Sequence, residues 1–163
     1  IGLGHKKIAH ISGDLNTQAA AQRLEGYKRS LEKNKIPFNK DYLLQTDYSR
    51  GQARMAAEKL IGFSSRPTAV FVASDSMALE VMAVVSEKGL KVPGDLSIIG
   101  YDDNPSGLYG PVALTTVKQP LVRMAQEAVK ELKILMDNRK NQKIKRILLP
   151  TELIIRESCK SLK

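Results

Sequence analysis

Four short apolar runs alternate with amphipathic segments over roughly the first two thirds of the chain, and this order constrains the fold more than any other feature. The clearest run is Thr68–Ala73, which is continuous, rich in β-branched residues and preceded by Pro67, as in a strand buried on both faces. Weaker runs occur at 7–12, 42–45 and 96–101. Because the connections between elements are only a few residues long, parallel strands with right-handed crossovers are expected. We therefore predict an α/β fold, an open parallel sheet with helices on both faces.

Helices are expected between these strands. The first carries apolar side chains at helical spacing, can be capped by Asn16 or Thr17, and lies before Pro37, which ends the segment. The second is expected over 49–62. Alanines and one leucine form the inner stripe of this second helix.

A third helix, expected over 76–88, is apolar on too many sides to cover one sheet only. Asp75 is placed to cap it, and Gly89 lies where a left-handed C-terminal cap belongs. A surface helix needs an apolar stripe only a little over 100° wide. The excess can be covered by another part of the same chain or by the same helix of a second subunit across a two-fold axis. The side chains left for this second face are Met77, Leu79 and Ala83.

The alternation stops after residue 101. Residues 114–118 are expected to be extended, 121–136 to be helical, and 147–155 to form two short strands interrupted by Pro150. The expected helix has an apolar stripe that must be buried against something. Its members are Leu121, Met124, Ala125, Ala128, Val129, Leu132 and Leu135.

The net charge of +9 is concentrated in the C-terminal part of the chain. Residues 118–163 carry twelve Lys and Arg against five Asp and Glu. The densest group is either a phosphate-binding patch or, in the plainer interpretation, a solvated loop between two elements. A nucleic-acid reader would add a recognition helix, zinc ligands or stacking aromatics, and aromatics are only 5%. The group consists of Arg139, Lys140, Lys143, Lys145 and Arg146.

Composition excludes several classes of protein. No apolar run approaches the roughly 20 residues of a membrane span, and no signal peptide is evident. A single cysteine, Cys159, cannot form an internal disulfide, and two histidines cannot complete a Cys/His metal cluster. We expect a cytoplasmic protein without metal or cofactor. Since the chain begins at Ile1, it is expected to be part of a longer protein.

Polar side chains follow each of the expected parallel strands. The carboxyl ends of the strands in an open parallel sheet border the ligand crevice, and Arg23 on the first helix can lean toward the same edge. One cation, several acceptors and an aromatic ring suit a polyhydroxylated or planar polar ligand, although each residue taken singly can also be a helix cap or turn residue. These residues are Asp14, Asp47, Tyr48, Ser74, Asp75, Asp102, Asp103 and Asn104.

Catalytic chemistry is poorly supported. His10, Ser12 and Asp14 alternate along one strand and point the same way, so they cannot build a base–nucleophile relay without help from elsewhere. Gly2 and Gly4 precede the first strand instead of following it, so they form no dinucleotide loop. We expect that the protein is not an enzyme.

Five blocks of sequence cover the chain in order. The most specific runs from Gly89 through Val92-Pro93 to Gly100-Tyr101-Asp102-Asp103, and the others are Gly4–Ala9, Arg23–Tyr27, Pro67–Leu79 and Leu114–Pro120. Together they closely resemble the lactose-repressor family of bacterial transcription regulators.

This resemblance implies a cytoplasmic repressor with a two-lobed effector-binding domain of the periplasmic-binding-protein type. Residues 1–118 would form its C-terminal lobe, 119–146 would cross to the other lobe, and 147–163 would return. The implied partners are a small effector, such as a sugar or related metabolite, a second copy of the chain, and operator DNA. The DNA would be bound by an N-terminal headpiece that lies outside this sequence.

By position, the resemblance also implies individual roles. It places effector contacts on Arg23, Asp102 and Tyr48, with Ser74 and Thr17 as weaker candidates. Ser74 stands where many relatives have a longer polar side chain. The subunit contact falls on the helix with Leu79 and on the turn around Tyr109.

Two other functions stay open at this point. A periplasmic-type sugar-binding protein of a transport system has the same lobes, but it would be monomeric and exported. A hydrolase of an α/β class would need a nucleophile–base pair that the sequence does not offer.

Overall fold

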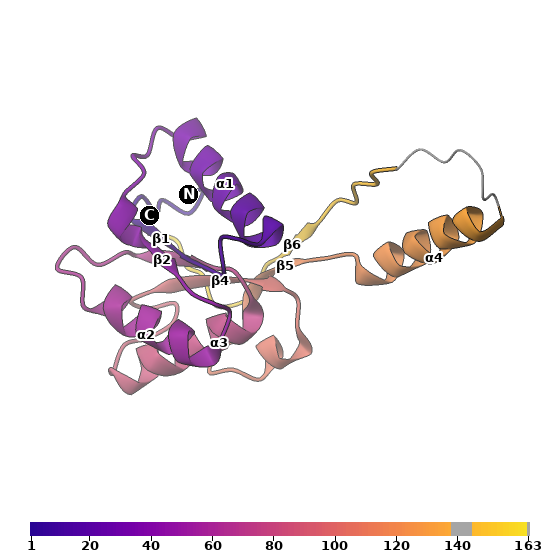
Figure 1. Cartoon of the computed structure of the whole chain (residues 1–163). Helices are drawn as coiled ribbons and strands as arrows, with labels where there is room; N and C mark the ends of the chain where they lie inside the picture. The colour runs from indigo at the N-terminus through magenta and orange to yellow at the C-terminus, as the bar shows by residue number, and fades with distance from the viewer. Residues whose placement is uncertain (138–144, 163) are drawn as a thin grey trace.

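The computed structural model describes residues 1–137 and 145–162, and its centre is one six-stranded sheet with helices on both faces (Figure 1). The strand order is β2-β1-β3-β4-β5-β6, in which the first five strands are parallel and β6 runs antiparallel to β5. The predicted fold class is confirmed. The strands are β1 (Ile8–Ser12), β2 (Leu43–Gln45), β3 (Ala69–Val72), β4 (Ser97–Asp102), β5 (Thr115–Lys118) and β6 (Glu152–Ile154).

Helices connect the parallel strands, with α1 on one face of the sheet and α2 and α3 on the other (Figure 1). The α-helices are α1 (Gln18–Lys33), α2 (Arg50–Ile61), α3 (Asp75–Glu87) and α4 (Leu121–Asp137), and two short 3₁₀ helices are η1 (Lys40–Tyr42) and η2 (Pro105–Leu108).

The main core lies between the sheet and the pair α2 and α3. Alternation along the strands sends Ala9, Ile11, Val70, Val72 and Ile98 to this side, where each is at most 1% exposed. Complete burial of aliphatic side chains on this scale is the largest favourable contribution to folding.

The opposite face of the sheet is covered less completely. A small cluster on α1 packs on the sheet through Leu24, Tyr27 and Leu31, and the Tyr27 hydroxyl donates to the Ile8 carbonyl. Since α1 is the only helix on this face among the described residues, side chains of β3, β4 and β5 beside it stay half-buried. The expectation of helices on both faces is met, but unequally.

Helix α4 extends away from the sheet (Figure 1). None of its side chains, all within the described residues, is buried. Of the predicted stripe, Leu121, Val129 and Leu135 are 57%, 65% and 52% exposed. The apolar stripe predicted from the sequence is therefore real, and nothing among the described residues covers it.

Three local expectations can be compared with the helix ends. Thr17 caps α1 by accepting from the Ala20 amide, and Gly89 has a φ of 72°, both as predicted. The prediction that Asp75 caps α3 is wrong, because the cap is Ser74, whose hydroxyl accepts from the Met77 amide.

The C-terminal part also differs from the sequence-based expectation. Of the two short strands expected over 147–155, only Glu152–Ile154 is a strand. In the basic group, Arg139, Lys140 and Lys143 lie outside the described residues. Lys145 pairs with Glu131 on α4, with 3.1 Å between nitrogen and oxygen.

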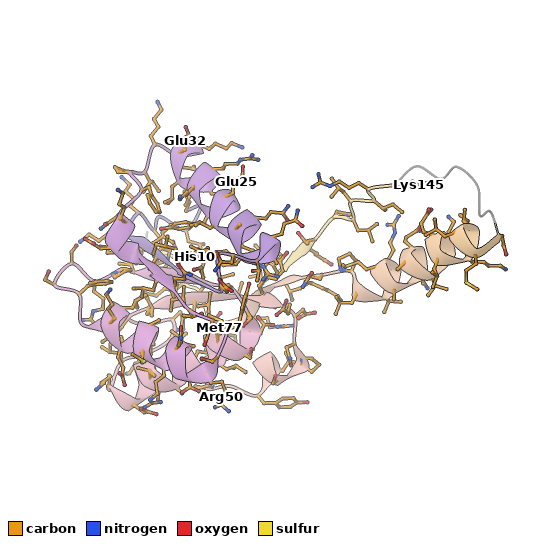
Figure 2. All side chains as sticks on the ribbon, in the orientation of Figure 1. His10, Glu25, Glu32, Arg50, Met77 and Lys145 are labelled. Atoms are coloured by element: carbon orange, nitrogen blue, oxygen red, sulfur yellow. The ribbon has the colours of Figure 1, made fainter. Side chains whose placement is uncertain are left out.

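His10 is a fully buried imidazole on β1 (Figure 2). Its ring stacks on Phe71, with centroids 4.7 Å apart, and its Nδ1–H donates to the Phe71 carbonyl. Nε2 has no hydrogen-bond partner among the described residues. Burial is the main reason why the pKa of His10 falls from 6.5 to about 4.

This pKa predicts a pH dependence of stability. Between about pH 6.5 and pH 4 the unfolded chain binds a proton at residue 10 and the folded chain does not, so the free energy of unfolding falls as the pH drops through this window. The contribution of His10 is expected to be about 3 kcal/mol between pH 7 and pH 4. Urea unfolding of the parent and of His10→Leu at both pH values measures it. An equal loss of stability in the two proteins would contradict the assignment.

Candidate functional site

A buried carboxylate organises the carboxyl edge of the sheet. Asp75, in the first turn of α3, is 1% exposed. It accepts from the Thr116 hydroxyl on β5 at 2.6 Å and from the Asn104 amide after β4 at 2.7 Å. Burial raises the pKa of Asp75, while these two hydrogen bonds act in the opposite direction. One side chain thus fixes the ends of two adjacent strands relative to a helix.

The turn that Asp75 holds has an unusual backbone. Asp102 and Asp103 have φ values of 118° and 58°. Residues other than glycine, asparagine and aspartate rarely adopt a positive φ. The third residue of the site with positive φ is Tyr48, at 69°. Such conformations persist only where surrounding contacts enforce them, and they concentrate at functional sites.

The two carboxylates of this turn have different partners. Asp102 accepts from the Gln119 amide group at 2.8 Å, and its Oδ1 lies 3.9 Å from Arg23. Asp103 pairs with Arg156, and its other oxygen lies 3.8 Å from Lys118. Asp102 therefore contacts the side chains of α1 and of the segment after β5, and Asp103 contacts those of β5 and the segment after β6, while both residues line a cavity at the base of α4.

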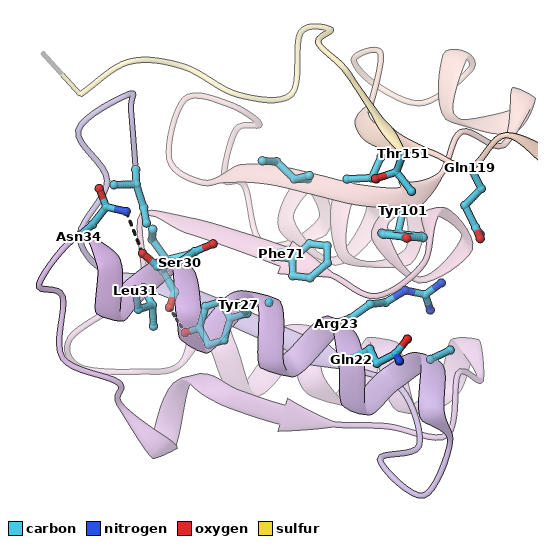
Figure 3. Close-up of a pocket in the computed structure, with 16 residues that line it drawn as sticks. Gln22, Arg23, Tyr27, Ser30, Leu31, Asn34, Phe71, Tyr101, Gln119 and Thr151 are labelled. Carbon is cyan, nitrogen blue, oxygen red and sulfur yellow. Dashed lines mark hydrogen bonds between the residues drawn. The ribbon is translucent and has the colours of Figure 1, made fainter. Parts of the chain in front are cut away.

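Arg23 is fixed by two aromatic residues. Its guanidinium lies over the Tyr101 ring, 3.9 Å from the ring centre, and donates to the Tyr48 hydroxyl at 3.1 Å. Its side chain is 16% exposed. A guanidinium stacked on an aromatic ring keeps its remaining N–H donors in a fixed plane. Figure 3 shows this side chain reaching from α1 toward Tyr101 and Gln119.

Burial also affects the acceptor beside Arg23. The pKa of Asp102 is raised, chiefly because the carboxyl is partly buried, although Gln119 and Arg23 both favour its charged form. The pair supplies a fixed group of donors next to a fixed acceptor. This arrangement suits a small ligand with adjacent hydroxyl or amide groups.

The other two predicted effector contacts, Ser74 and Thr17, already form hydrogen bonds within the chain. Ser74 is buried, and its hydroxyl is already engaged by the Met77 amide and by Ser76. Thr17 is exposed, donates to the Asp14 carbonyl and caps α1. Both side chains have structural partners that a ligand would have to share or replace.

Tyr101 and Gln119 are site residues that the sequence-based reasoning did not single out. Both line an open groove of about 880 Å³ between α1 and the sheet, together with Arg23, Phe71 and Val117. Figure 3 shows the apolar side chains of the sheet forming the floor of this groove. Arg23 and Gln119 stand at the end of it near the strand termini.

The predicted subunit-contact residues on α3 fall into two groups. Met77 is fully buried inside the chain (Figure 2) and has no surface left for a second subunit. Assigning it to that contact was wrong, because α2 and the sheet cover this side of α3. Leu79 and Ala83 are half-buried, and Tyr109 is 86% exposed.

Two kinds of feature are absent from residues 1–137 and 145–162. No group of three or more His, Cys, Asp or Glu side chains there could hold a metal ion. No helix in the same residues is long and apolar enough to cross a membrane.

Comparison with known proteins identifies the family. Residues 1–159 match the periplasmic binding protein-like domain. The chain is 39% identical over 165 residues to the HTH-type transcriptional repressor PurR of Haemophilus influenzae (strain PittEE), covering 99% of this chain and 49% of that protein. It is 36% identical over 163 residues to the ribose operon repressor of Haemophilus influenzae (strain ATCC 51907 / DSM 11121 / KW20 / Rd), covering 100% and 49%. The crystal structure of the lac repressor dimer bound to operator and the anti-inducer ONPF matches with a TM-score of 0.85 and 32% identity, covering 98% and 55%.

The chain belongs to the periplasmic-binding-protein-like domain family, and the resemblance to the lactose-repressor family is confirmed. It spans about half the length of the curated relatives that it matches. Those relatives are named as repressors, in agreement with the expectation that this protein is not an enzyme.

The packing around Asp75 predicts the effect of a small substitution. A Cβ atom at Gly100 would lie 2.1 Å from the Asp75 carboxylate, so Gly100→Ala must displace it. We expect a loss of about 1–3 kcal/mol in the free energy of unfolding, measured in urea.

The matched control is Gly26→Ala on α1, where the added Cβ meets no atom within 4 Å. That variant is expected to gain up to about 1 kcal/mol, because alanine favours a helix interior over glycine. If both variants were equally stable, the close contact at Gly100 would have no energetic importance.

Proposed function

We propose that this chain is the effector-binding and dimerisation lobe of a cytoplasmic transcriptional repressor. Its effector is a small neutral polar molecule, a sugar or a related metabolite. The parent protein binds operator DNA through a headpiece outside this sequence, and effector binding shifts the equilibrium between DNA-binding and non-binding states. The observation that carries the proposal is the fixed pair Arg23 and Asp102 at the carboxyl edge of the parallel sheet.

The charges of the pair support a neutral ligand. Arg23 and Asp102 face each other at 3.9 Å and largely compensate each other's charge, so an anionic ligand would meet the Asp102 carboxylate as well as the guanidinium. A hydroxyl group can donate to the carboxylate and accept from the guanidinium at the same time. Tyr48 adds an aromatic ring beside this pair, as in many sites for sugars and planar rings.

The position of α4 supports a second lobe. Its exposed apolar stripe belongs to a helix connected to the sheet by β5 on one side and by the segment before β6 on the other. We propose that residues 119–146 pack on a second lobe of the parent protein and that 147–163 return to this one. The ligand site would then lie between the two lobes.

A transport protein that binds sugars is the alternative with the same fold. Relatives named as repressors over the whole length of this chain favour the regulator. Upstream sequence of the parent gene distinguishes the two, since the repressor requires a helix-turn-helix headpiece and the transport protein a signal peptide.

The effector site can be tested by two substitutions. Arg23→Ala removes the guanidinium, and Asp102→Asn removes the charge while keeping a residue type that tolerates positive φ. Each is expected to weaken binding by roughly 10- to 150-fold, corresponding to about 1.5–3 kcal/mol for a hydrogen bond to a charged group. The measurement is calorimetric titration of the full-length parent protein, with D-ribose as the first probe and other neutral monosaccharides and nucleobases after it.

Arg29→Ala is the matched control for this experiment. Arg29 lies on the same helix and pairs with exposed Glu25 outside the pocket, so its removal should leave affinity unchanged. Parent-like affinity in both pocket variants would contradict the assignment of Arg23 and Asp102.

The proposed subunit contact on α3 can be tested by a substitution at Leu79. Leu79 is half-buried on α3, near Gly110, in the chain alone, and Leu79→Glu would bring two carboxylates together across a two-fold axis. We expect this variant to sediment as a monomer at micromolar concentration, where the parent sediments as a dimer, with an unchanged circular dichroism spectrum. Met55→Glu, on the outer side of α2, should remain dimeric. A dimeric Leu79→Glu protein would place the contact elsewhere.

A further inference from the structure

Gln119 occupies a junction between the pocket and the connection to α4. It follows the last residue of β5 and precedes the helix by two positions. Gln119 lines the groove beside α1 and also two cavities at the base of α4. The residue therefore borders both the proposed effector site and the point where the chain leaves the lobe.

The side chain and the main chain of Gln119 bind different parts of the molecule. Its side-chain amide donates to Asp102 Oδ1 at 2.8 Å. Its carbonyl accepts from the Leu121 amide at 2.9 Å, and the next carbonyl, that of Pro120, accepts from Met124. A single residue therefore joins the carboxylate of the proposed site to the first turn of α4.

The oxygen that Gln119 holds is the one that faces Arg23. Oδ1 of Asp102 accepts from Gln119 and lies 3.9 Å from the guanidinium. The φ of Asp102 is 118°, a backbone conformation that residues with a side chain rarely adopt, so contacts around Asp102 must hold it there. The hydrogen bond from Gln119 therefore helps to set where the carboxylate stands and which lone pairs it offers to a ligand.

The second chain connection is fastened differently. Arg156, just after β6, pairs with Asp103 and also donates to the Leu114 carbonyl at 2.8 Å. That contact joins two charged groups with low exposure, whereas the contact at Gln119 has a neutral donor. Charge on both partners makes the stronger hydrogen bond, so the connection at residues 119–120 is the one that ligand binding can alter more easily.

We propose that Gln119 is a positioning residue of the effector site, which orients Asp102 and fastens it to the first turn of α4. The inference rests on the proposed function in assigning Asp102 to the effector. A ligand hydroxyl that bonds to Oδ1 must share or replace the Gln119 amide, and this changes how the chain leaves the lobe. The side chain of Gln119 then connects the proposed effector site directly to the start of α4.

The test reverses the donor and the acceptor. Gln119→Glu sets a second carboxylate against Asp102, and Asp102→Asn converts the acceptor side chain to one with an amide donor. In the double variant the amide at 102 can donate to the carboxylate at 119, so the bond returns with its direction reversed. Asparagine also tolerates the positive φ of residue 102.

The readout is hydrogen exchange of the amides at Leu121 and Met124 in the full 163-residue chain. We expect Gln119→Glu to exchange about fivefold faster than the parent at these amides, and the double variant to return to within about twofold of it. Gln126→Glu makes the same chemical change further along α4, on an exposed side chain, and should match the parent. Exchange at β3 monitors global stability in all variants.

The possible outcomes are decisive without any ligand. Parent-like exchange in Gln119→Glu would overturn the proposal, and so would a double variant that exchanges as fast as Gln119→Glu alone. Failure of D-ribose and the other probes to bind the full-length parent would count against the proposed function and would leave this result unaffected. The two ideas can therefore fail independently.

Discussion

The buried carboxylate of Asp75 is the interaction on which the site depends. It lies almost without solvent contact at the start of α3, and its two hydrogen bonds reach β5 and the turn after β4. Burial of a carboxylate is costly unless its oxygens are bonded, and the positive end of a helix favours negative charge at this position. The amide that the buried carboxylate holds belongs to Asn104, which directly follows Asp102 and Asp103, the two residues with positive φ whose carboxylates have different partners.

Most of the fold could be predicted from the sequence, since each strand has an apolar run and each helix an apolar period. The predictions that failed concern side chains whose contacts are made by residues far away in the sequence. Asp75 has the right residue type for a helix cap, but its partners lie 29 and 41 positions away, and Ser74 was free to take the cap. The full burial of Met77 depends on how α2 packs on α3, which the period of one helix cannot show.

The candidate site was predictable in outline. Parallel strands end at one edge of a sheet, and this rule predicts that Tyr48 and Asp102 lie at the same edge. The position of Arg23 on the first helix predicts that its long side chain can reach that edge. Tyr101 was missed because strand alternation turns it toward α1, where it meets Arg23. Gln119 was missed because its distance from Asp102 is set by the pairing of Asp102 with Lys118 between β4 and β5. Such cross-strand register follows from the folded sheet and has no signal in a single sequence.

The antiparallel pairing of β5 with β6 has a consequence for how such a protein can be divided. Lys118 pairs with Glu152, so the chain leaves and re-enters the sheet at directly opposed residues. In topological terms, residues 119–151 are a long insertion into a β-hairpin. A two-residue Asn-Gly turn could close that hairpin without changing the register of any strand. The six-stranded sheet would then be closed by one short turn, and the chain would run through it without the excursion to α4.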